Sequence, residues 1–450
     1  MPLKTIISKT IAVSGIAAML FSCKPEIIAP APTKGSLDVT TYVALGNSLT
    51  AGYADNALYN QGQAYSYPNL IAQQFKLIGG GDFRQPLVNA TSVGIGSSLN
   101  ARYTLAPVKD CQGNTSLAPI PMAQQGDLSI FTTSVAAQGP FNNMGVPGAK
   151  TITIVYPGYG NPANGAGNYN PYFTRMTSDP TNASMLSDAA SQKPTFFSLT
   201  IGNNDVLSYA FNGGASDYIT PSAGPAGVGF DASVDLIVNT LTANGAKGII
   251  ANIPDLSSMP YFTTIPYNGL ILDQPSAAGL SAAYAPLGIS FQAGSNPFII
   301  QDNGAPGGMR QIKNGEYLLI TIPQDSLKCG GWGSLKPIPT QYVLTADKVS
   351  QISTAISNFN AKLKSSADAK GLAFVDVNSF MSSVKTGILY NGIGLSNQFV
   401  SGGAFSLDGI HLTPLGNALL ANEYIKAINK KYGSTIPMIN ATSYRGVSFP

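Results

Sequence analysis

Short hydrophobic runs in this chain alternate with longer stretches in which hydrophobic residues recur at helical spacing. Four short runs predict buried β-strands. They cover residues 41–45, 195–201, 248–252 and 372–377. The first two stop at Gly46 and Gly202, as a buried strand does before a turn.

Four other stretches predict helices with one hydrophobic face. They cover residues 66–77, 231–244, 345–365 and 414–432. Thr345 and Thr413 stand where N-caps are expected, and Pro414 suits a first helical position,. Gly433 is expected to end the last helix,.

Strands that alternate with helices predict a parallel sheet covered by helices on both faces, a three-layer α/β sandwich. Two stretches rich in glycine and proline interrupt this pattern, at about 79–140 and 254–342. We interpret the first as an irregular insertion. The second is expected to include a short hairpin around 317–322.

The composition limits the classes of partner. Hydrophobic residues make up 44% of the 450 positions, which argues against a disordered chain,. Charged residues make up only 10%, against about 25% in an average soluble protein,. With a net charge of +3 and no basic stripe, nucleic acid is not an expected partner,.

The first residues are typical of an export signal. Lys4 and Lys9 precede a short apolar run, which ends in Leu20-Phe-Ser-Cys23,. This arrangement resembles the signal of bacterial lipoproteins, which is cleaved before a cysteine that is then acylated. We therefore predict a signal peptide at 1–22, a lipidated Cys23 and a linker at 23–38. An ordinary secretory signal with an incidental cysteine is the alternative.

Export has consequences for the rest of the molecule. We expect the protein at the cell envelope, lipid-anchored to a membrane, most simply the outer membrane, on its periplasmic or its surface-facing side. Cys111 and Cys329 would then lie in an oxidising compartment,. The sequence allows either a disulfide between them or two free thiols.

His411 is the one histidine of the chain, and it stands three residues after Asp408. A carboxylate at this spacing can hold one ring nitrogen of the imidazole and leave the other free to act as a base. Two other polar segments follow predicted strands: Gly46-Asn47-Ser48-Leu49 and Gly202-Asn203-Asn204-Asp205. A fourth, 143–149, also has the pattern of a strand that leads into a loop.

In their order along the chain, these segments resemble the sequence blocks of the SGNH hydrolases, also called the GDSL esterase/lipase family. The resemblance implies a flavodoxin-like fold over residues 39–450, outside the two insertions. It also implies Ser48 as nucleophile with His411 and Asp408, and an oxyanion hole from Ser48, Gly148 and Asn204. Asn47 departs from the family, which has aspartate there, so altered local hydrogen bonding is expected.

The second block is the least distinct, because Ser92-Val-Gly94-Ile-Gly96 is a rival to the glycine turn at Gly148. Each site residue also has a purely structural reading. Ser48 could simply end a strand, Gly148 and Asn204 could form turns, and Asp408 could cap backbone N–H groups.

Ser48, His411 and Asp408 match the logic of a serine hydrolase, in which a base activates a hydroxyl and an acid holds the base. The Gly-x-Ser-x-Gly motif of α/β-hydrolases does not occur,. One histidine cannot readily build a metal centre, so no metal or cofactor is expected. We therefore expect an esterase or lipase that acts on glycan or lipid esters. A non-catalytic surface-binding lipoprotein with the same fold is the alternative.

Overall fold

Five parallel strands form the central sheet, in the order β15-β8-β7-β1-β6. Their bounds are β1 Tyr42–Gly46, β6 Asn143–Gly145, β7 Phe196–Thr200, β8 Lys247–Ala251 and β15 Ala373–Val375. Numbered along the chain within this sheet, the order is 2-1-3-4-5, which is the flavodoxin-like order. All residues of β1 and β7 are buried, as expected for strands covered on both faces,.

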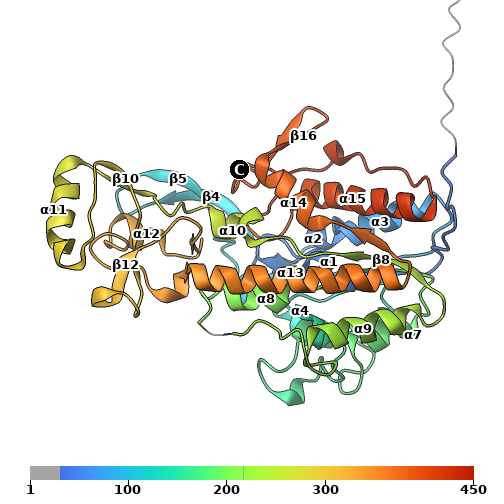
Figure 1. Cartoon of the computed structure of the whole chain (residues 1–450). Coiled ribbons are helices and arrows are strands. Elements are labelled where there is room, and N and C mark those ends of the chain that lie inside the picture. The colour runs from blue at the N-terminus through green and yellow to red at the C-terminus, as the bar shows by residue number, and fades with distance from the viewer. Residues whose placement is uncertain (1–30, 216) are drawn as a thin grey trace, which may run out of the picture. The chain divides into compact units, whose positions relative to one another are not determined.

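This computed structural model describes residues 31–215 and 217–450 (Figure 1). The predicted signal peptide and Cys23 lie outside the described residues. Residues 33–450 form one compact unit. Thr33 is hydrogen-bonded to Thr435, and Leu37 is only 3% exposed, so the packed part of the chain begins before residue 39, our predicted boundary. No helix in the described ranges is long and apolar enough to cross a membrane.

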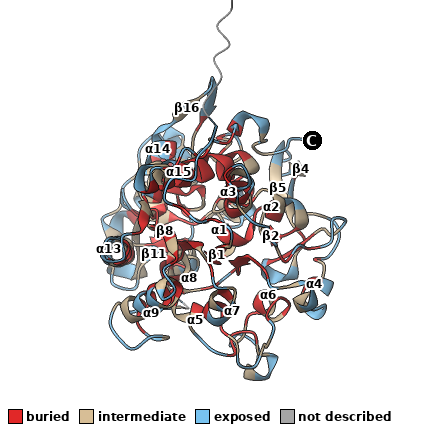
Figure 2. Ribbon diagram, turned by 90° about the vertical axis from the view of Figure 1, so that its right-hand side faces the viewer, coloured by how far each residue is buried: buried red, intermediate tan, exposed pale blue. Residues whose placement is uncertain are grey.

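Helices cover both faces of the sheet, which confirms the predicted three-layer sandwich (Figures 1 and 2). One face is covered by α3 Tyr67–Lys76, α14 Val377–Thr386 and α15 Pro414–Tyr432. The other is covered by α7 Met185–Ser191, α9 Phe230–Thr242 and α13 Ala346–Ala369. The buried residues concentrate around the sheet and α15 (Figure 2).

The two predicted caps behave differently. The Thr413 hydroxyl accepts a hydrogen bond from the Gly416 N–H and caps α15, which ends at Gly433 as expected. Thr345 occupies the N-cap position of α13, but its hydroxyl bonds to Asp347 and accepts no helix N–H. The capping role predicted for Thr345 is therefore wrong, although the helix begins where expected.

The first insertion is more regular than expected. It contains an antiparallel hairpin in which β4 Tyr103–Lys109 pairs with β5 Thr115–Pro121 over seven residue pairs. Prolines at 107, 119 and 121 conceal these strands in the sequence, because proline within a run weakens a strand prediction,.

The second insertion forms a lobe with its own small hydrophobic cluster around Phe298, Ile300 and Leu318. It includes α11 Gln274–Tyr284 and the strand pairs β9–β10 and β11–β12. The bounds of these strands are β9 Leu270–Leu272, β10 Gly294–Asn296, β11 Ile299–Gln301 and β12 Met309–Gln311. The hairpin predicted around 317–322 is wrong, because β13 Tyr317–Leu318 pairs with the distant β14 Val343–Leu344.

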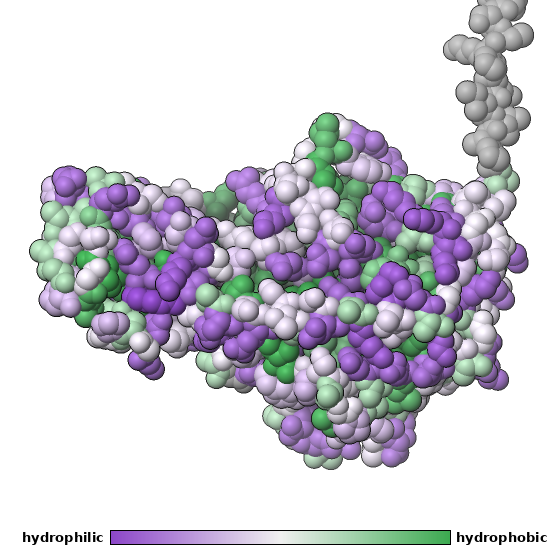
Figure 3. Space-filling model, viewed as in Figure 1, coloured by the Kyte–Doolittle hydropathy of each residue, from purple (hydrophilic) through white to green (hydrophobic). Residues whose placement is uncertain are grey.

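Cys111 and Cys329 form a disulfide, so the paired alternative holds. This bond joins the first insertion to the second across a sequence separation of 218 residues. On the face shown in Figure 3, hydrophilic residues are interspersed with weakly hydrophobic ones and with small strongly hydrophobic areas, over both the lobe and the sandwich.

Candidate active site

The polar segments that follow β1 and β7 meet at one edge of the sheet. Ser48 is the first residue of the short helix α1 Ser48–Ala51, directly after β1. Asn204 lies in the first turn of α8 Asn203–Ala210, directly after β7. In the 2-1-3-4-5 order, the crevice for ligands lies between the first and third strands at their carboxyl ends. Here these strands are β1 and β7.

The segment before α15 carries His411 to the same crevice. His411 Nε2 lies 2.8 Å from Ser48 Oγ, although 363 residues separate the two in sequence. His411 Nδ1 lies 2.9 Å from Asp408 Oδ2. A hydroxyl, an imidazole and a carboxylate thus form one continuous hydrogen-bonded chain, in the arrangement of a serine hydrolase triad.

The carboxylate of Asp408 is held from several sides. Its Oδ1 accepts hydrogen bonds from the N–H groups of Ile410 and His411, at 2.9 and 2.8 Å. Its Oδ2 accepts a further bond from the Asn56 N–H at 2.9 Å. Burial alone would raise the pKa of Asp408, but the attraction of His411 and these hydrogen bonds hold that pKa well below its usual range,. Asp408 is therefore an anion when it faces the imidazole.

A turn at Asp55 and Asn56 supports the triad and was not anticipated from the sequence. Both residues have left-handed backbone conformations, with φ of 51° and 60°, which are uncommon for residues other than glycine,. The Asp55 carboxylate accepts hydrogen bonds from the Leu407 N–H and the Tyr59 hydroxyl. Burial raises the pKa of Asp55. This turn ties the segment after the nucleophile to the segment that carries Asp408.

The Asn56 turn also explains the rival glycine segment. A Cβ atom on Gly96 would lie 1.6 Å from the Asn56 carbonyl oxygen, so only glycine fits there,. The Gly94 N–H donates to Ser92 Oγ and the Gly96 N–H donates to the Asn100 carbonyl. Both amides are therefore engaged, and this segment offers no donor for an oxyanion.

Gly148 has the features expected of the oxyanion glycine. It has φ of 82° and lines the same cavity as Ser48. Among residues 31–215 and 217–450, no group accepts a hydrogen bond from its N–H. The Ser48 N–H, at the first position of α1, has no acceptor within the helix,. Asn204 Nδ2 donates one hydrogen to the Ala149 carbonyl at 3.0 Å, which fixes the amide and leaves its second hydrogen available,.

Asn47 is 2% exposed, and its side-chain oxygen accepts the Leu49 N–H at 3.1 Å. It therefore caps α1 and fixes the turn on which Ser48 stands. An asparagine carbonyl can accept this bond as a carboxylate would.

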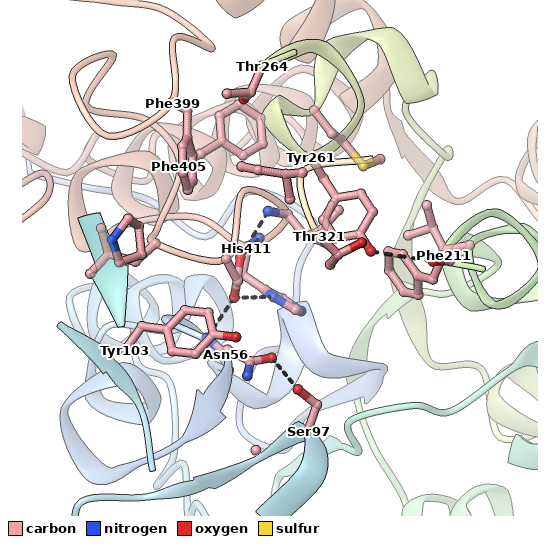
Figure 4. A pocket seen from close by; sticks show the side chains of 18 of the residues that line it. Asn56, Ser97, Tyr103, Phe211, Tyr261, Thr264, Thr321, Phe399, Phe405 and His411 are labelled. Carbon is pink, nitrogen blue, oxygen red and sulfur yellow. Dashed lines mark hydrogen bonds and ion pairs between the residues drawn. The ribbon is translucent and has the colours of Figure 1, made fainter. Parts of the chain in front are cut away.

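The site opens into a cavity of about 1790 Å³ (Figure 4). Tyr103, Tyr261, Phe399 and Phe405 lie around His411 in this view. Tyr53 packs against the imidazole with ring centroids 4.8 Å apart. Within the described ranges, no group of three or more His, Cys, Asp or Glu side chains is placed to hold a metal ion.

Comparison with known proteins places this geometry in context. The family model described as GDSL-like Lipase/Acylhydrolase matches residues 42–424. A crystal structure from Parabacteroides merdae, described as a GDSL-like lipase, has 12% identity and a TM-score of 0.33, covering 88% of this chain and 99% of that one. The extracellular lipase from Streptomyces rimosus has 12% identity and a TM-score of 0.34, covering 87% of this chain and 98% of that one. None of the curated proteins matches the chain.

Proposed function

Because this chain belongs to the GDSL-like lipase/acylhydrolase family, we propose that it is a serine esterase that cleaves carboxylic esters through an acyl-enzyme on Ser48. The observation that carries the proposal is the hydrogen-bonded chain from Ser48 Oγ through His411 to Asp408. A serine hydroxyl is a weak nucleophile until a base removes its proton, and His411 Nε2 is within reach to do so.

In the first half of the reaction, His411 Nε2 takes the proton of the Ser48 hydroxyl as Ser48 Oγ forms a bond to the ester carbonyl carbon. The carbonyl π electrons move to the oxygen, which becomes an oxyanion. The tetrahedral species then collapses, the bond to the leaving alkoxy oxygen breaks, and His411 donates its proton to that oxygen. The anionic Asp408 stabilises the imidazolium that exists between these two transfers.

The oxyanion lies where three donors can converge: the N–H groups of Ser48 and Gly148, and the amide of Asn204. Such donors favour the transition state because they are already oriented before charge develops. The bond from Asn204 to the Ala149 carbonyl supports this role, since it restrains the side chain beside Gly148.

In the second half, His411 removes a proton from a water molecule, whose oxygen attacks the acyl-enzyme carbonyl. The acid is released when the bond to Ser48 Oγ breaks and Oγ regains the proton. An alcohol in place of water would give acyl transfer by the same steps. The chemistry needs no group from outside the chain other than ester and acceptor.

We further propose that the protein acts at the cell envelope, held by a lipid on Cys23, most simply at the outer membrane. Deacetylation of glycans and hydrolysis of lipid esters are the two substrate classes that this location suggests. The Cys111–Cys329 disulfide supports export, because such bonds persist in oxidising compartments,.

The direct test is hydrolysis of p-nitrophenyl acetate by the wild type and by Ser48→Ala. The expected loss of turnover is at least about 10³-fold, since removing the nucleophile ends covalent catalysis. Ser365 is an exposed serine on α13, so Ser365→Ala is the matched control and should retain full activity. Equal turnover by the wild type and Ser48→Ala rejects the proposal, as does a wild type inactive on every ester offered, which a non-catalytic binding protein would be.

A further inference from the structure

The two insertions meet beside the active-site cavity. The hairpin β4–β5 runs from the sandwich toward the lobe formed by the second insertion (Figure 1). At its base, the Tyr103 N–H donates to the Asp55 carbonyl at 2.7 Å, next to the turn that holds Asp408. At its tip, Cys111 is bonded to Cys329, which follows α12 Gln324–Lys328.

Polar contacts surround the disulfide and fix the tip of the hairpin on the lobe. Asp110 Oδ2 pairs with Lys328 Nζ at 3.0 Å. The Cys111 N–H donates to Asp325 Oδ1 at 3.3 Å. The other carboxylate oxygen of Asp110 accepts the N–H groups of Gln112 and Asn114, which closes the turn between β4 and β5.

The cavity that holds Ser48 is also lined by this hairpin and by α12. Tyr103 of β4 and residues of β5, among them Leu117 and Pro119, line it. Leu327 and Lys328 of α12 line it as well. Pockets that take a small ligand have volumes of roughly 300–1000 Å³, so this cavity exceeds what the reacting ester group needs,.

The lining is predominantly apolar. Among the Asp, Glu, Lys, Arg and His residues in the described part of the chain, only Asp408, His411 and Lys328 line the cavity. The first two belong to the triad, and Lys328 is paired with Asp110. No unpaired charge is therefore offered to a ligand, and transfer of an apolar group from water into this space is favourable.

We propose that the hairpin β4–β5 and α12, joined by Cys111–Cys329, form a stapled wall that selects uncharged esters with an extended apolar group. We use the term stapled wall for residues 103–121 and 324–329. This inference rests on the proposed esterase function and assigns the specificity of that site to two segments outside its α/β sandwich.

The first test places a charge on the wall. We compare Leu117→Asp with Leu128→Asp, because both leucines belong to the first insertion and have matched exposed fractions of 45% and 44%. Leu117 lines the cavity and Leu128 does not. The measured quantity is the ratio of kcat/KM for p-nitrophenyl laurate to that for p-nitrophenyl acetate, using the full chain.

For the wild type, this ratio is expected to be well above one. Leu117→Asp should lower it at least about ten-fold, which corresponds to about 1.4 kcal/mol. The loss should arise chiefly through a higher KM for laurate, because a carboxylate replaces an apolar side chain of the wall. Leu128→Asp should leave it unchanged. A parallel loss on both esters, or equal ratios in the two variants, overturns the assignment.

The second test opens the staple. Both cysteines are exposed, so dithiothreitol can reach the bond in the folded protein. Reduction of the wild type and the double substitution Cys111→Ser/Cys329→Ser should each lower the laurate-to-acetate ratio. Dithiothreitol should not change the ratio of the double variant further. A ratio that survives both treatments shows that the disulfide does not shape the wall.

The outcomes separate the two proposals. A wild type without Ser48-dependent hydrolysis of any ester removes the esterase function. A wild type that cleaves acetate through Ser48 but prefers acetate to laurate keeps that function and overturns only the stapled wall.

Discussion

Asp408 accepts four hydrogen bonds: one from the imidazole of His411 and three from backbone N–H groups, which hold the carboxylate in place for the ring. One of the four comes from the backbone of Asn56, which belongs to the segment after the nucleophile rather than to the segment of the triad acid. The segments around Asn56 and Asp408, 352 residues apart in sequence, are therefore coupled by a bond that does not involve the reacting atoms. The left-handed backbone at Asp55 and Asn56 is consistent with strain held at a functional site,.

At the residue scale, Asn204 provides a kinetic prediction. Asn204→Ala should lower kcat on a short aryl ester about 10²- to 10³-fold, because one of three oxyanion donors is lost. KM should change much less, since the donor acts on charge that develops only in the transition state. Steady-state kinetics check both parameters.

The isosteric variant Asn204→Asp is the matched comparison, because it keeps the size of the side chain and replaces the donor with a negative charge. It should be at least as inactive as Asn204→Ala. A kcat within a few-fold of the wild type in both variants contradicts the oxyanion role of Asn204.

Asp205, the next residue, provides a prediction about pH. It is fully buried, its Oδ2 accepts the N–H and the hydroxyl of Thr151 at 2.8 and 3.0 Å, and burial raises its pKa. The unfolded chain, with a pKa of about 3.9, then loses the proton first as the pH rises. Stability therefore falls from about pH 4 up to the folded pKa.

Asp205→Asn removes that loss. The free energy of unfolding of the variant, relative to the wild type, should increase between about pH 4 and pH 7. Each unit by which the pKa is raised contributes about 1.4 kcal/mol. Urea denaturation at several pH values measures it, and a difference that stays constant with pH disproves this account.

The residues with reactive side chains could be found in the sequence, because only a few residue types perform such chemistry and a single histidine limits the choice. The residues that hold these side chains in place could not be found in the sequence. Asn56 contributes a backbone N–H, which every residue except proline has, so no sequence pattern distinguishes it. In the sequence, Gly96 is a rival candidate for the oxyanion glycine. The actual reason for a glycine at this position is the close approach of the Asn56 backbone, which only the three-dimensional structure shows.

At the element scale, α15 begins at Pro414, three residues after His411, the last triad residue in the sequence. Thr413 Oγ1 accepts the Gly416 N–H at 3.1 Å and donates to the Gly403 carbonyl at 2.7 Å. Thr413→Ala should lower the free energy of unfolding by at least about 1 kcal/mol. Thermal or urea denaturation measures the change.

The chain offers a matched control in Thr345, which has the same position on α13 without the capping bond. Thr345→Ala should change stability by less than about 0.5 kcal/mol. Equal losses in the two variants would show that the cap on α15 is not what stabilises its first turn.

The main strands and helices could be predicted because burial on both faces of a parallel sheet leaves continuous hydrophobic runs. The insertions follow other rules. The hairpin β4–β5 carries prolines in its strands, and β13 pairs with β14 across a long stretch of chain, so neither has a local signal. Helix α14 was also missed, since it follows β15 after a single residue, Asp376, which caps it.

At the scale of the whole molecule, the disulfide makes one unit of two insertions that the sequence analysis treated separately. Their individual compositions show only turns and polar residues. Their meeting depends on the pairing of Cys111 with Cys329, which the sequence left open. The stapled wall is therefore a property of the folded chain and not of either insertion alone.

The proposed anchor provides a prediction at this scale. Expressed in a bacterium that exports lipoproteins, the wild type should incorporate labelled palmitate and sediment with membranes. Cys23→Ser should lose the label and leave the membrane fraction, while its folded unit keeps esterase activity. Palmitate incorporation that persists in Cys23→Ser shows that the anchor lies elsewhere or that the signal is of another kind.

The most direct test of the account is covalent labelling by a fluorophosphonate, which reacts only with a serine activated by its base. We predict one adduct per wild-type chain, located on Ser48 by peptide mass spectrometry, no adduct in Ser48→Ala and strongly slowed labelling in His411→Ala. A wild type that stays unlabelled, or a label that persists in Ser48→Ala, would contradict the central claim that Ser48 and His411 act together.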